Sequence, residues 1–426
     1  MKKIALVYSF QESDWFSCTV ICRNLITAYE LAYGKENVLH IDYTRYREVS
    51  VNDLKLIFTE KIDRLIFIDH KPTPITFIER LMSVKSDKTS WPEMTVHVFG
   101  DYPLYLTEWR SFNQIMKGLR VKYITASERQ ANYLANYVAQ KELIQVSPFP
   151  VDTQKFRYKE GNGELRAKLK IAKDAQIFIY TGRLSYQKRI VELVSTFLSC
   201  KRDKKIGENS YLILIGECDN LGQPYLSYTQ LQGEYYRSIQ HILEEYDDIS
   251  DSVILTGNLK NDVLVEYYNT ANAFISFSTY HDEDYGMSVA EALCCGLPLI
   301  LTDWAGYYSF NFKEIKDQLI FVPVKLGKEL PVLDENDLQN AIQNFSNKEI
   351  NCKEIENTAK KYLSIEAVSE RLKKIGDISV PAYEGGTDVM VQMTNEQYLR
   401  HNEFLRSETT REFNHFYYKV YDAYIK

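Results

Sequence analysis

Two glutamates, Glu283 and Glu291, stand eight positions apart in residues 281–298, the most informative segment of the chain. The stretch from Met287 onward has the pattern of a helix that begins just after a glycine turn. Such a helix places Glu291 about one turn inside and leaves Glu283 in the preceding loop, so both carboxylates can grip hydroxyl groups of one ligand. Free amides and the positive dipole end at the helix start suit a diphosphate. The competing interpretation is a solvated acidic loop before an ordinary core helix.

A basic loop follows the apolar run that ends at Tyr180. Gly182 permits a sharp turn there, and Arg183 and Lys188 come soon after it. Arginine offers a planar fork of donors and lysine a mobile point charge, so both can reach a phosphate leaving group. A basic loop is usually just solvated, but this one directly follows an expected strand and lies in the same half of the chain as the two glutamates.

Short apolar runs alternate with longer amphipathic stretches, and this order predicts an α/β protein in which strands are separated by helices. Unbroken apolar runs suit parallel strands that crossover helices cover on both faces. Ligands bind beyond the carboxyl ends of such strands, so we expect ligand-binding residues in the loops that follow them. The runs cover residues 4–7, 65–68, 95–99, 177–180, 212–215, 253–255, 273–277, 297–301 and 319–322.

The length of 426 residues exceeds what one hydrophobic core usually serves, so two domains with a cleft between them are expected. A polar, glycine-containing stretch at residues 158–163 marks the boundary. We therefore expect domains at 1–160 and 161–380. The remaining segment, 381–426, has aromatic residues at partly helical spacing and is interpreted as a packed terminal helix, with a membrane-surface helix as the alternative.

Composition limits the partners and the compartment. Hydrophobic residues make up 45% and charged residues 26%, as in soluble globular proteins, and the formal charge of −7 gives no reason to expect nucleic acid. The seven cysteines lack the paired spacing of a zinc site and fit reduced thiols in the cytosol. The first apolar run is too short for a signal peptide, and no run approaches the roughly 18 residues of a spanning helix. A cytoplasmic protein with at most peripheral membrane contact is expected.

The two motifs together resemble the retaining GT-B glycosyltransferases of family four, also called glycosyl transferases group 1. Residues 182–188 match that family's G-R-x-x-x-x-K loop, and residues 283–291 match its E-x7-E motif. Residues 124–128, 147–156 and 267–273 add weaker matches, so the resemblance covers roughly residues 95 to 375. It implies two Rossmann-like doubly wound domains facing across a cleft, with the acceptor side in 1–160, the donor side in 161–380 and the last helix packed back on the N-terminal domain.

The resemblance also implies roles for single residues. Arg183 and Lys188 would bind the donor diphosphate, Glu291 the nucleotide ribose and Glu283 the hydroxyls of the transferred sugar. His97, ahead of His70, is the candidate for an active-site histidine beside that sugar. Further donor contacts would come from backbone near the diphosphate and the base, at Gly182, Gly286, Met287, Ser288, Asn258 and Leu259.

A retaining hexosyltransferase of this family would take a UDP- or GDP-linked sugar and pass it to a sugar, glycolipid or glycoprotein acceptor, as in polysaccharide biosynthesis. It would need no metal and no other cofactor. Departures from the family pattern concentrate on the acceptor side: a bulky loop at 9–15 replaces the usual glycine-rich one, and Pro150 replaces a glycine.

Other classes of protein compete with this interpretation. A nicotinamide oxidoreductase shares the alternating pattern, but no G-x-G-x-x-G follows an expected strand. A GT-B sugar-nucleotide epimerase or phosphorylase, or a noncatalytic sugar-nucleotide-binding scaffold, stays open.

Overall fold

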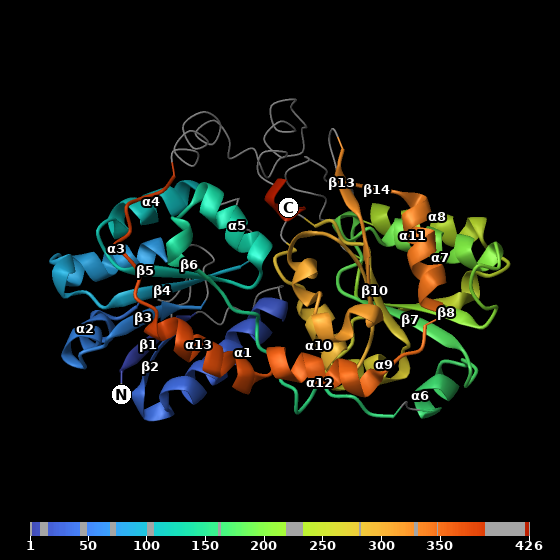
Figure 1. The fold of residues 1–426 in the computed structure, drawn as a ribbon, viewed down its shortest axis with the longest axis horizontal. Coiled ribbons are helices and arrows are strands. Elements are labelled where there is room, and N and C mark those ends of the chain that lie inside the picture. Colours follow the sequence, from blue (N-terminus) through green and yellow to red (C-terminus); the bar gives the residue numbers. More distant parts are fainter. Residues whose placement is uncertain are drawn as a thin grey trace. The chain divides into compact units, whose positions relative to one another are not determined.

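The computed structural model describes residues 2–8, 16–42, 49–68, 74–99, 106–160, 163–218, 233–280, 283–327, 331–346, 348–387 and 422–425. The chain forms two compact units (Figure 1). The N-terminal unit comprises Met1–Pro150 and Tyr362–Asn402, and the C-terminal unit comprises Val151–Lys361 and Glu403–Lys426. The division falls between Pro150 and Val151, whereas the composition shift places it after residue 160.

The N-terminal unit is built on a parallel sheet whose described strands run in the order β2-β1-β3-β4-β5-β6. The inner strands are mainly apolar and are buried almost throughout, as is typical of a parallel sheet covered by helices. The strands are β1 (Ile4–Tyr8), β2 (Val38–Asp42), β3 (Arg64–Phe67), β4 (Glu93–Val98), β5 (Val121–Thr125) and β6 (Ile144–Val146). The helices are α1 (Phe16–Tyr33), α2 (Val51–Thr59), α3 (Ile75–Val84), α4 (Leu106–Met116), α5 (Glu128–Tyr137) and α13 (Ile365–Asp377).

The C-terminal unit repeats this plan. Its parallel sheet has the described order β12-β11-β10-β7-β8-β9, so β10 and β7 lie side by side although almost a hundred residues separate them. The strands are β7 (Gln176–Thr181), β8 (Ser210–Ile215), β9 (Val253–Gly257), β10 (Ala273–Ser276), β11 (Leu299–Thr302) and β12 (Leu319–Val322), with a hairpin of β13 (Val324–Leu326) and β14 (Pro331–Leu333). The helices are α6 (Gly163–Lys168), α7 (Ile190–Arg202), α8 (Glu234–Glu245), α9 (Asn261–Thr270), α10 (Met287–Cys294), α11 (Glu335–Ser346) and α12 (Cys352–Leu363). Both sheets have the parallel architecture that the apolar runs predict.

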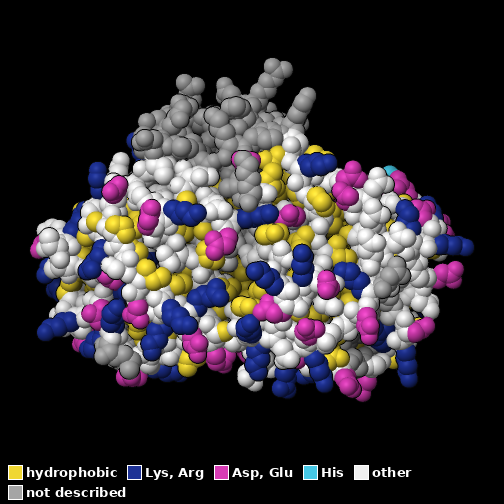
Figure 2. All heavy atoms as spheres, viewed as in Figure 1, with side chains coloured by type: hydrophobic (Ala, Val, Ile, Leu, Met, Phe, Trp, Pro, Cys, Tyr) yellow, Lys and Arg dark blue, Asp and Glu magenta, His cyan; other side chains and the backbone are white. Residues whose placement is uncertain are grey.

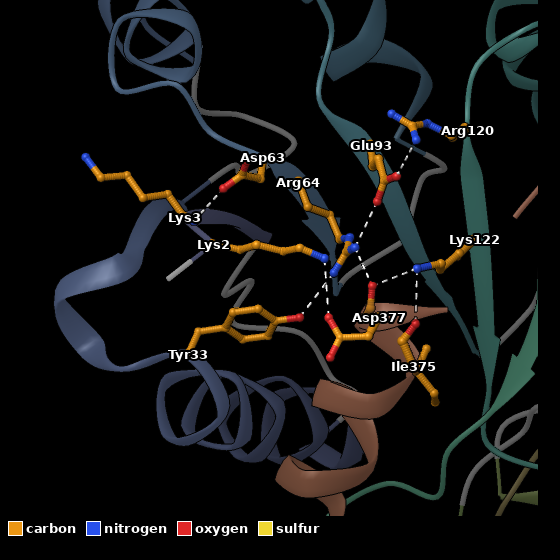
Figure 3. Close-up of polar contacts among 11 residues, drawn as sticks. Lys2, Lys3, Tyr33, Asp63, Arg64, Glu93, Arg120, Lys122, Ile375 and Asp377 are labelled. Atoms are coloured by element: carbon orange, nitrogen blue, oxygen red, sulfur yellow. Dashed lines mark hydrogen bonds and ion pairs between the residues drawn. The ribbon is translucent and has the colours of Figure 1, made fainter. Parts of the chain in front are cut away.

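Helix α13 belongs to the N-terminal unit, although the expected donor domain extends to residue 380. Its last carbonyls receive buried cations from the sheet: Arg64 donates to Gly376 O, and Lys122 Nζ lies 3.0 Å from both Ile375 O and Gly376 O (Figure 3). Positive side chains at a helix C-terminus satisfy carbonyls that have no partner in the helix and oppose the helix dipole. Glu93 pairs with Arg64 at 2.8 Å, which balances one of the two cations.

The expected terminal segment, 381–426, divides between the two units where it is described. Tyr383 donates its amide to Leu119 O and its hydroxyl to Val138 O, so the chain up to Thr387 lies on the N-terminal unit. The turn η12 (Asp422–Tyr424) lies instead on the C-terminal unit. Residues 388–421, which hold most of the expected terminal helix, are outside the described residues.

The visible surface carries acidic and basic side chains mixed in sign, with apolar side chains scattered between them (Figure 2). None of the described helices combines the length and the apolar character that crossing a membrane would require.

Candidate active site

The two sequence motifs meet at one edge of the C-terminal sheet, because they follow the neighbouring strands β7 and β10. The turn after β7 is tight: the amide of Gly182 donates to Ile215 O at 3.0 Å, and Leu184 N donates to Glu217 O at 2.8 Å. A Cβ at Gly216 would lie 2.0 Å from Gly182 O, so only glycine allows the loops after β7 and β8 to approach this closely. The basic loop is thereby held over the carboxyl end of the sheet.

Lys188 and Glu283 form an ion pair at the centre of this edge. The Lys188 ammonium lies 2.5 Å from Glu283 Oε2, and the hydroxyl of Ser278 donates to the same oxygen at 2.6 Å. Burial lowers the pKa of Lys188, and the neighbouring Glu283 carboxylate opposes that shift. A pair so enclosed holds the basic loop and the acidic loop in one fixed geometry.

An aromatic ring lies against both expected diphosphate ligands. The ring centroid of Tyr280 is 4.6 Å from Lys188 Nζ and 5.5 Å from the guanidinium carbon of Arg183. Both distances are within the range of cation–π attraction. Tyr280 was not among the site residues predicted from the sequence, although its position three residues before Glu283 is a usable signal.

Helix α10 begins where the E-x7-E motif predicts a helix start, after Gly286 in a left-handed conformation with φ 99°. The amides of Met287 and Ser288 lie in its first turn, where amides have no acceptor within the helix. Glu291, one turn further on, is buried, and burial raises the pKa of its carboxyl to about 8 while the charge of Lys155 acts in the opposite direction. Among the described residues, none donates a hydrogen bond to this carboxylate.

The loop after β11 closes against the acidic loop. Gly306 N donates to Glu283 O at 2.7 Å, and a Cβ at Gly306 would lie 2.1 Å from the carbonyl carbon of Asp284. The ring of Tyr307 lies where a Cβ of Gly286 would project. These two glycines allow the backbone that carries Glu283 to pack without a gap on its neighbours.

Arg189 follows the basic motif directly and is buried. Its structural role in connecting three elements was not predicted from the sequence. Its Nε donates to Thr279 Oγ1 at 2.9 Å, its Nη1 pairs with Glu192 at 2.9 Å, and its Nη2 donates to Pro331 O. It therefore joins α7 to the loop after β10 and to β14. Its neighbour Lys188 pairs instead with Glu283, so the two adjacent cations make different contacts.

The expected base contacts lie one strand further out. Asn258 and Leu259 follow β9, which pairs with β8 and not with β7. They lie at the same edge of the sheet, the first exposed and the second half-buried.

His97 has the surroundings of a core residue. It lies in β4 of the N-terminal unit, is 1% exposed, and its Nε2 is 2.7 Å from the hydroxyl of Tyr29 on α1. Burial lowers its pKa to about 3, so the imidazole is neutral. This geometry gives no support to the catalytic role expected for His97; its rival, His70, is outside the described residues. Within the described part of the chain, no cluster of three or more histidine, cysteine, aspartate or glutamate side chains could hold a metal ion.

Comparison with known proteins identifies the class of enzyme. Residues 162–362, which carry both motifs, match the model of the family described as glycosyl transferases group 1. The protein is a glycosyltransferase. Its relatives include lipopolysaccharide 1,2-N-acetylglucosaminetransferase of Salmonella typhimurium, 22% identical over 63% of this chain and 70% of that protein. Alpha-monoglucosyldiacylglycerol synthase of Streptococcus pneumoniae is 28% identical over 42% of this chain and 36% of that protein.

Solved structures show the same fold for this glycosyltransferase. The Anabaena protein HepE, in complex with UDP and glucose, covers 88% of this chain with 99% of its own length, at a TM-score of 0.61 and 12% identity. WaaG, described as a glycosyltransferase involved in lipopolysaccharide biosynthesis, covers 88% of this chain with 100% of its own length, at a TM-score of 0.54 and 12% identity. The two Rossmann-like units of the transferase are therefore those of the GT-B fold.

Proposed function

We propose that this enzyme is a retaining, metal-independent hexosyltransferase that moves a sugar from a nucleotide-diphosphate sugar to a saccharide or glycoconjugate acceptor. The observation that carries the proposal is the convergence of Arg183 and Lys188 on Tyr280, beside Glu283 and the start of α10. Two cations and a helix N-terminus at one sheet edge form a site for a diphosphate.

Each group has a distinct part in the proposed transfer. Arg183, Lys188 and the first amides of α10 stabilise the negative charge that develops on the departing diphosphate. The Glu291 carboxylate accepts hydrogen bonds from the ribose, and Glu283 accepts them from the transferred sugar. Because these cations are part of the chain, the proposed leaving-group stabilisation requires no divalent ion.

Retention follows from a front-face attack in this proposal. The acceptor hydroxyl oxygen bonds to the anomeric carbon as the bond from that carbon to the diphosphate breaks, and the hydroxyl proton passes to the departing phosphate oxygen. No protein nucleophile takes part. Glu283 is already engaged by Lys188 and Ser278 at one oxygen, which suits a binding role better than that of a free nucleophile.

A UDP-linked hexose is the donor that we favour over a GDP-linked one, because HepE was solved with UDP and glucose. The donor groups all lie in the C-terminal unit, so we assign acceptor recognition to the N-terminal unit. One relative is named for lipopolysaccharide and the other for a glucosyldiacylglycerol. We therefore propose that the acceptor is a glycolipid of one of these two kinds. An enzyme with such an acceptor would work in the cytoplasm and contact the membrane peripherally.

A donor screen followed by product analysis tests the function. The purified chain is first screened for thermal stabilisation by UDP- and GDP-sugars, where a ligand at 100 times its Kd adds about 2.7 kcal/mol. Transfer to saccharide and glycolipid acceptors is then measured with and without EDTA, and the anomeric configuration of the product is determined by NMR. An inverted product refutes retention, loss of activity in EDTA refutes metal independence, and conversion of the donor without an acceptor indicates an epimerase or hydrolase.

A further inference from the structure

We propose that Tyr424 is a positioning residue of the donor site, acting through Trp304 on the residue whose ring faces Lys188 and Arg183. The inference rests on the proposed function, since it assigns this support to the site that would hold the donor diphosphate. It links the described segment 422–425 to the loop after β10, which lies about 140 positions earlier in the chain.

The first link is an aromatic contact. The rings of Tyr424 and Trp304 meet edge to face, with centroids 5.6 Å apart and an interplanar angle of 86°. Tyr424 is 2% exposed and Trp304 is fully buried, so this contact is part of a packed interior. The turn η12 that carries Tyr424 (red in Figure 1) packs on η8 (Ala305–Phe310), the turn that directly follows Trp304. Aromatic rings in this edge-to-face geometry contribute stabilising free energy in addition to that from the apolar area they bury.

The second link is a hydrogen bond from Trp304 to the backbone of the acidic loop. The indole Nε1 donates to Tyr280 O at 2.7 Å, and an indole has no other polar atom with which to compete. On the other side of the same residue, Tyr280 N donates to Ser278 Oγ at 3.2 Å. The backbone of Tyr280 is thus held at both its amide and its carbonyl.

The third link is the ring of Tyr280 itself. It attracts the two cations that the proposed function needs, over distances at which the attraction depends on the position of the ring. Lysine and arginine side chains have many rotamers, so a fixed ring restricts them before the donor arrives. Movement of the Tyr280 backbone would therefore weaken diphosphate binding without removing any group that touches the diphosphate.

Three variants separate positioning from stability. Tyr424→Ala removes the ring, Tyr424→Phe keeps it, and Trp304→Phe keeps an aromatic ring but deletes the N–H donor. Tyr236→Ala is the matched control, because Tyr236 is an exposed tyrosine on α8 of the same unit. For each variant, calorimetry gives the affinity for UDP, thermal unfolding without ligand gives stability, and steady-state kinetics give KM for the nucleotide sugar and kcat.

We expect Tyr424→Ala and Trp304→Phe each to weaken UDP binding about fivefold to tenfold, with a matching rise in donor KM. Tyr424→Phe and Tyr236→Ala should bind UDP as the wild type does. UDP affinities equal to wild type in Tyr424→Ala and Trp304→Phe, whatever their unfolding temperatures, would overturn the inference and leave the proposed function intact. If the wild-type chain binds neither UDP nor any nucleotide sugar, the proposed function fails and the inference fails with it.

Discussion

At the scale of single residues, the buried Lys188–Glu283 ion pair can serve either the stability of the fold or the binding of a ligand. The pair is mostly enclosed, with side-chain exposures of 13% and 8%. Removing two charges from water costs about as much as their attraction returns, so such a pair adds little net stability. Its position between the basic and the acidic loop fits a binding function better than a stabilising one.

Variants of this pair should separate stability from activity. Lys188→Met should lower turnover by about 100-fold through lost leaving-group stabilisation, and should destabilise the fold by about 3 kcal/mol because Glu283 is left buried without its cation. The double variant Lys188→Met, Glu283→Gln should regain most of the stability but none of the activity. Urea denaturation and transfer assays on the same preparations check both parts, and a double variant as unstable as the single one would contradict the explanation.

Glu291 gives a pH-dependent prediction. Burial raises the pKa of Glu291 in the folded chain to about 8, above the ordinary value of 4.5, so between these values the folded chain holds a proton that the unfolded chain has lost. Stability from this group is therefore complete below about pH 4.5 and falls as the pH rises to about 8. Glu291→Gln should become progressively more stable than wild type over that interval, while it binds the free nucleotide diphosphate more weakly. Denaturant unfolding from pH 5 to 8.5 measures the difference, and a constant difference would exclude Glu291 as the titrating group.

At the scale of elements, the loops after β10 and β11 hold one another through backbone contacts. The loops approach each other most closely at Gly306. Its amide donates to Glu283 O, and a side chain at this position would overlap the Asp284 backbone. Loops that approach through glycine can place Glu283 rigidly without a hydrophobic core of their own.

Gly306→Ala should therefore displace the acidic loop and weaken nucleotide-sugar binding by at least about tenfold, since a Cβ 2.1 Å from the Asp284 backbone cannot be accommodated without a shift. The matched control is Gly163→Ala at the start of α6, where an added Cβ meets no atom within 4 Å. This control should bind donor normally and unfold at the same or a slightly higher temperature. Normal donor affinity in Gly306→Ala would show that the loop tolerates displacement.

Lys122, whose amine donates to the last carbonyls of α13, gives a second prediction at the scale of elements. Burial lowers the pKa of Lys122 to about 8 from 10.5, so between these values the unfolded chain holds a proton that the folded chain has released. The stability contributed by Lys122 should then rise from pH 8 to about 10.5, because the buried charge is lost while the amine still donates to Ile375 O and Gly376 O. Lys122→Met should cost about 1 kcal/mol at pH 7.5 and more at pH 10. Urea unfolding of both proteins at the two pH values measures this, and a cost that shrinks at pH 10 would contradict the assignment.

At the scale of the whole molecule, the described residues form two six-stranded parallel sheets, one in each unit, each with its own order of strands. All the proposed donor ligands lie in the C-terminal unit, whereas His97 lies in the N-terminal unit. The proposed donor site can thus be tested as a property of one unit within the intact protein.

Hydrogen exchange with and without UDP should show protection concentrated in three segments of the C-terminal unit. These segments lie at the proposed donor edge of the sheet: 182–189 after β7, 283–291 after β10, and 257–260 at the end of β9. Amides there should exchange more slowly at 100 times the Kd of UDP, because a ligand that binds only the folded state suppresses local opening. Free uridine, which lacks the diphosphate, is the control and should protect 182–189 less. Protection confined to the N-terminal unit would place the nucleotide elsewhere.

Local patterns in the sequence were enough to predict most of the parallel strands, although not β2, β5 or β6, and the helix start at Met287. They were also enough to place Gly182, Arg183 and Lys188 in a loop after one strand and Glu283 in a loop after another. These features depend on neighbours within a few positions: an apolar run covered on both faces, a glycine at a turn, a carboxylate one helical turn further on. The edge at which the two loops meet also follows, because parallel strands present all their carboxyl ends on one side.

The tertiary structure alone decided which of these residues touch and which are enclosed. The contact of Lys188 with Glu283 spans 95 positions, and that of Trp304 with Tyr424 spans more, so no local period reveals either. His97 lies within the apolar run 95–99, and Tyr29 from α1 packs against it and encloses it. The chain also returns to its N-terminal unit at Tyr362, before the expected end of the donor domain, because buried cations from β3 and β5 receive the end of α13. Such choices depend on how side chains far apart in the sequence fill space and pair charges, which composition and spacing do not encode.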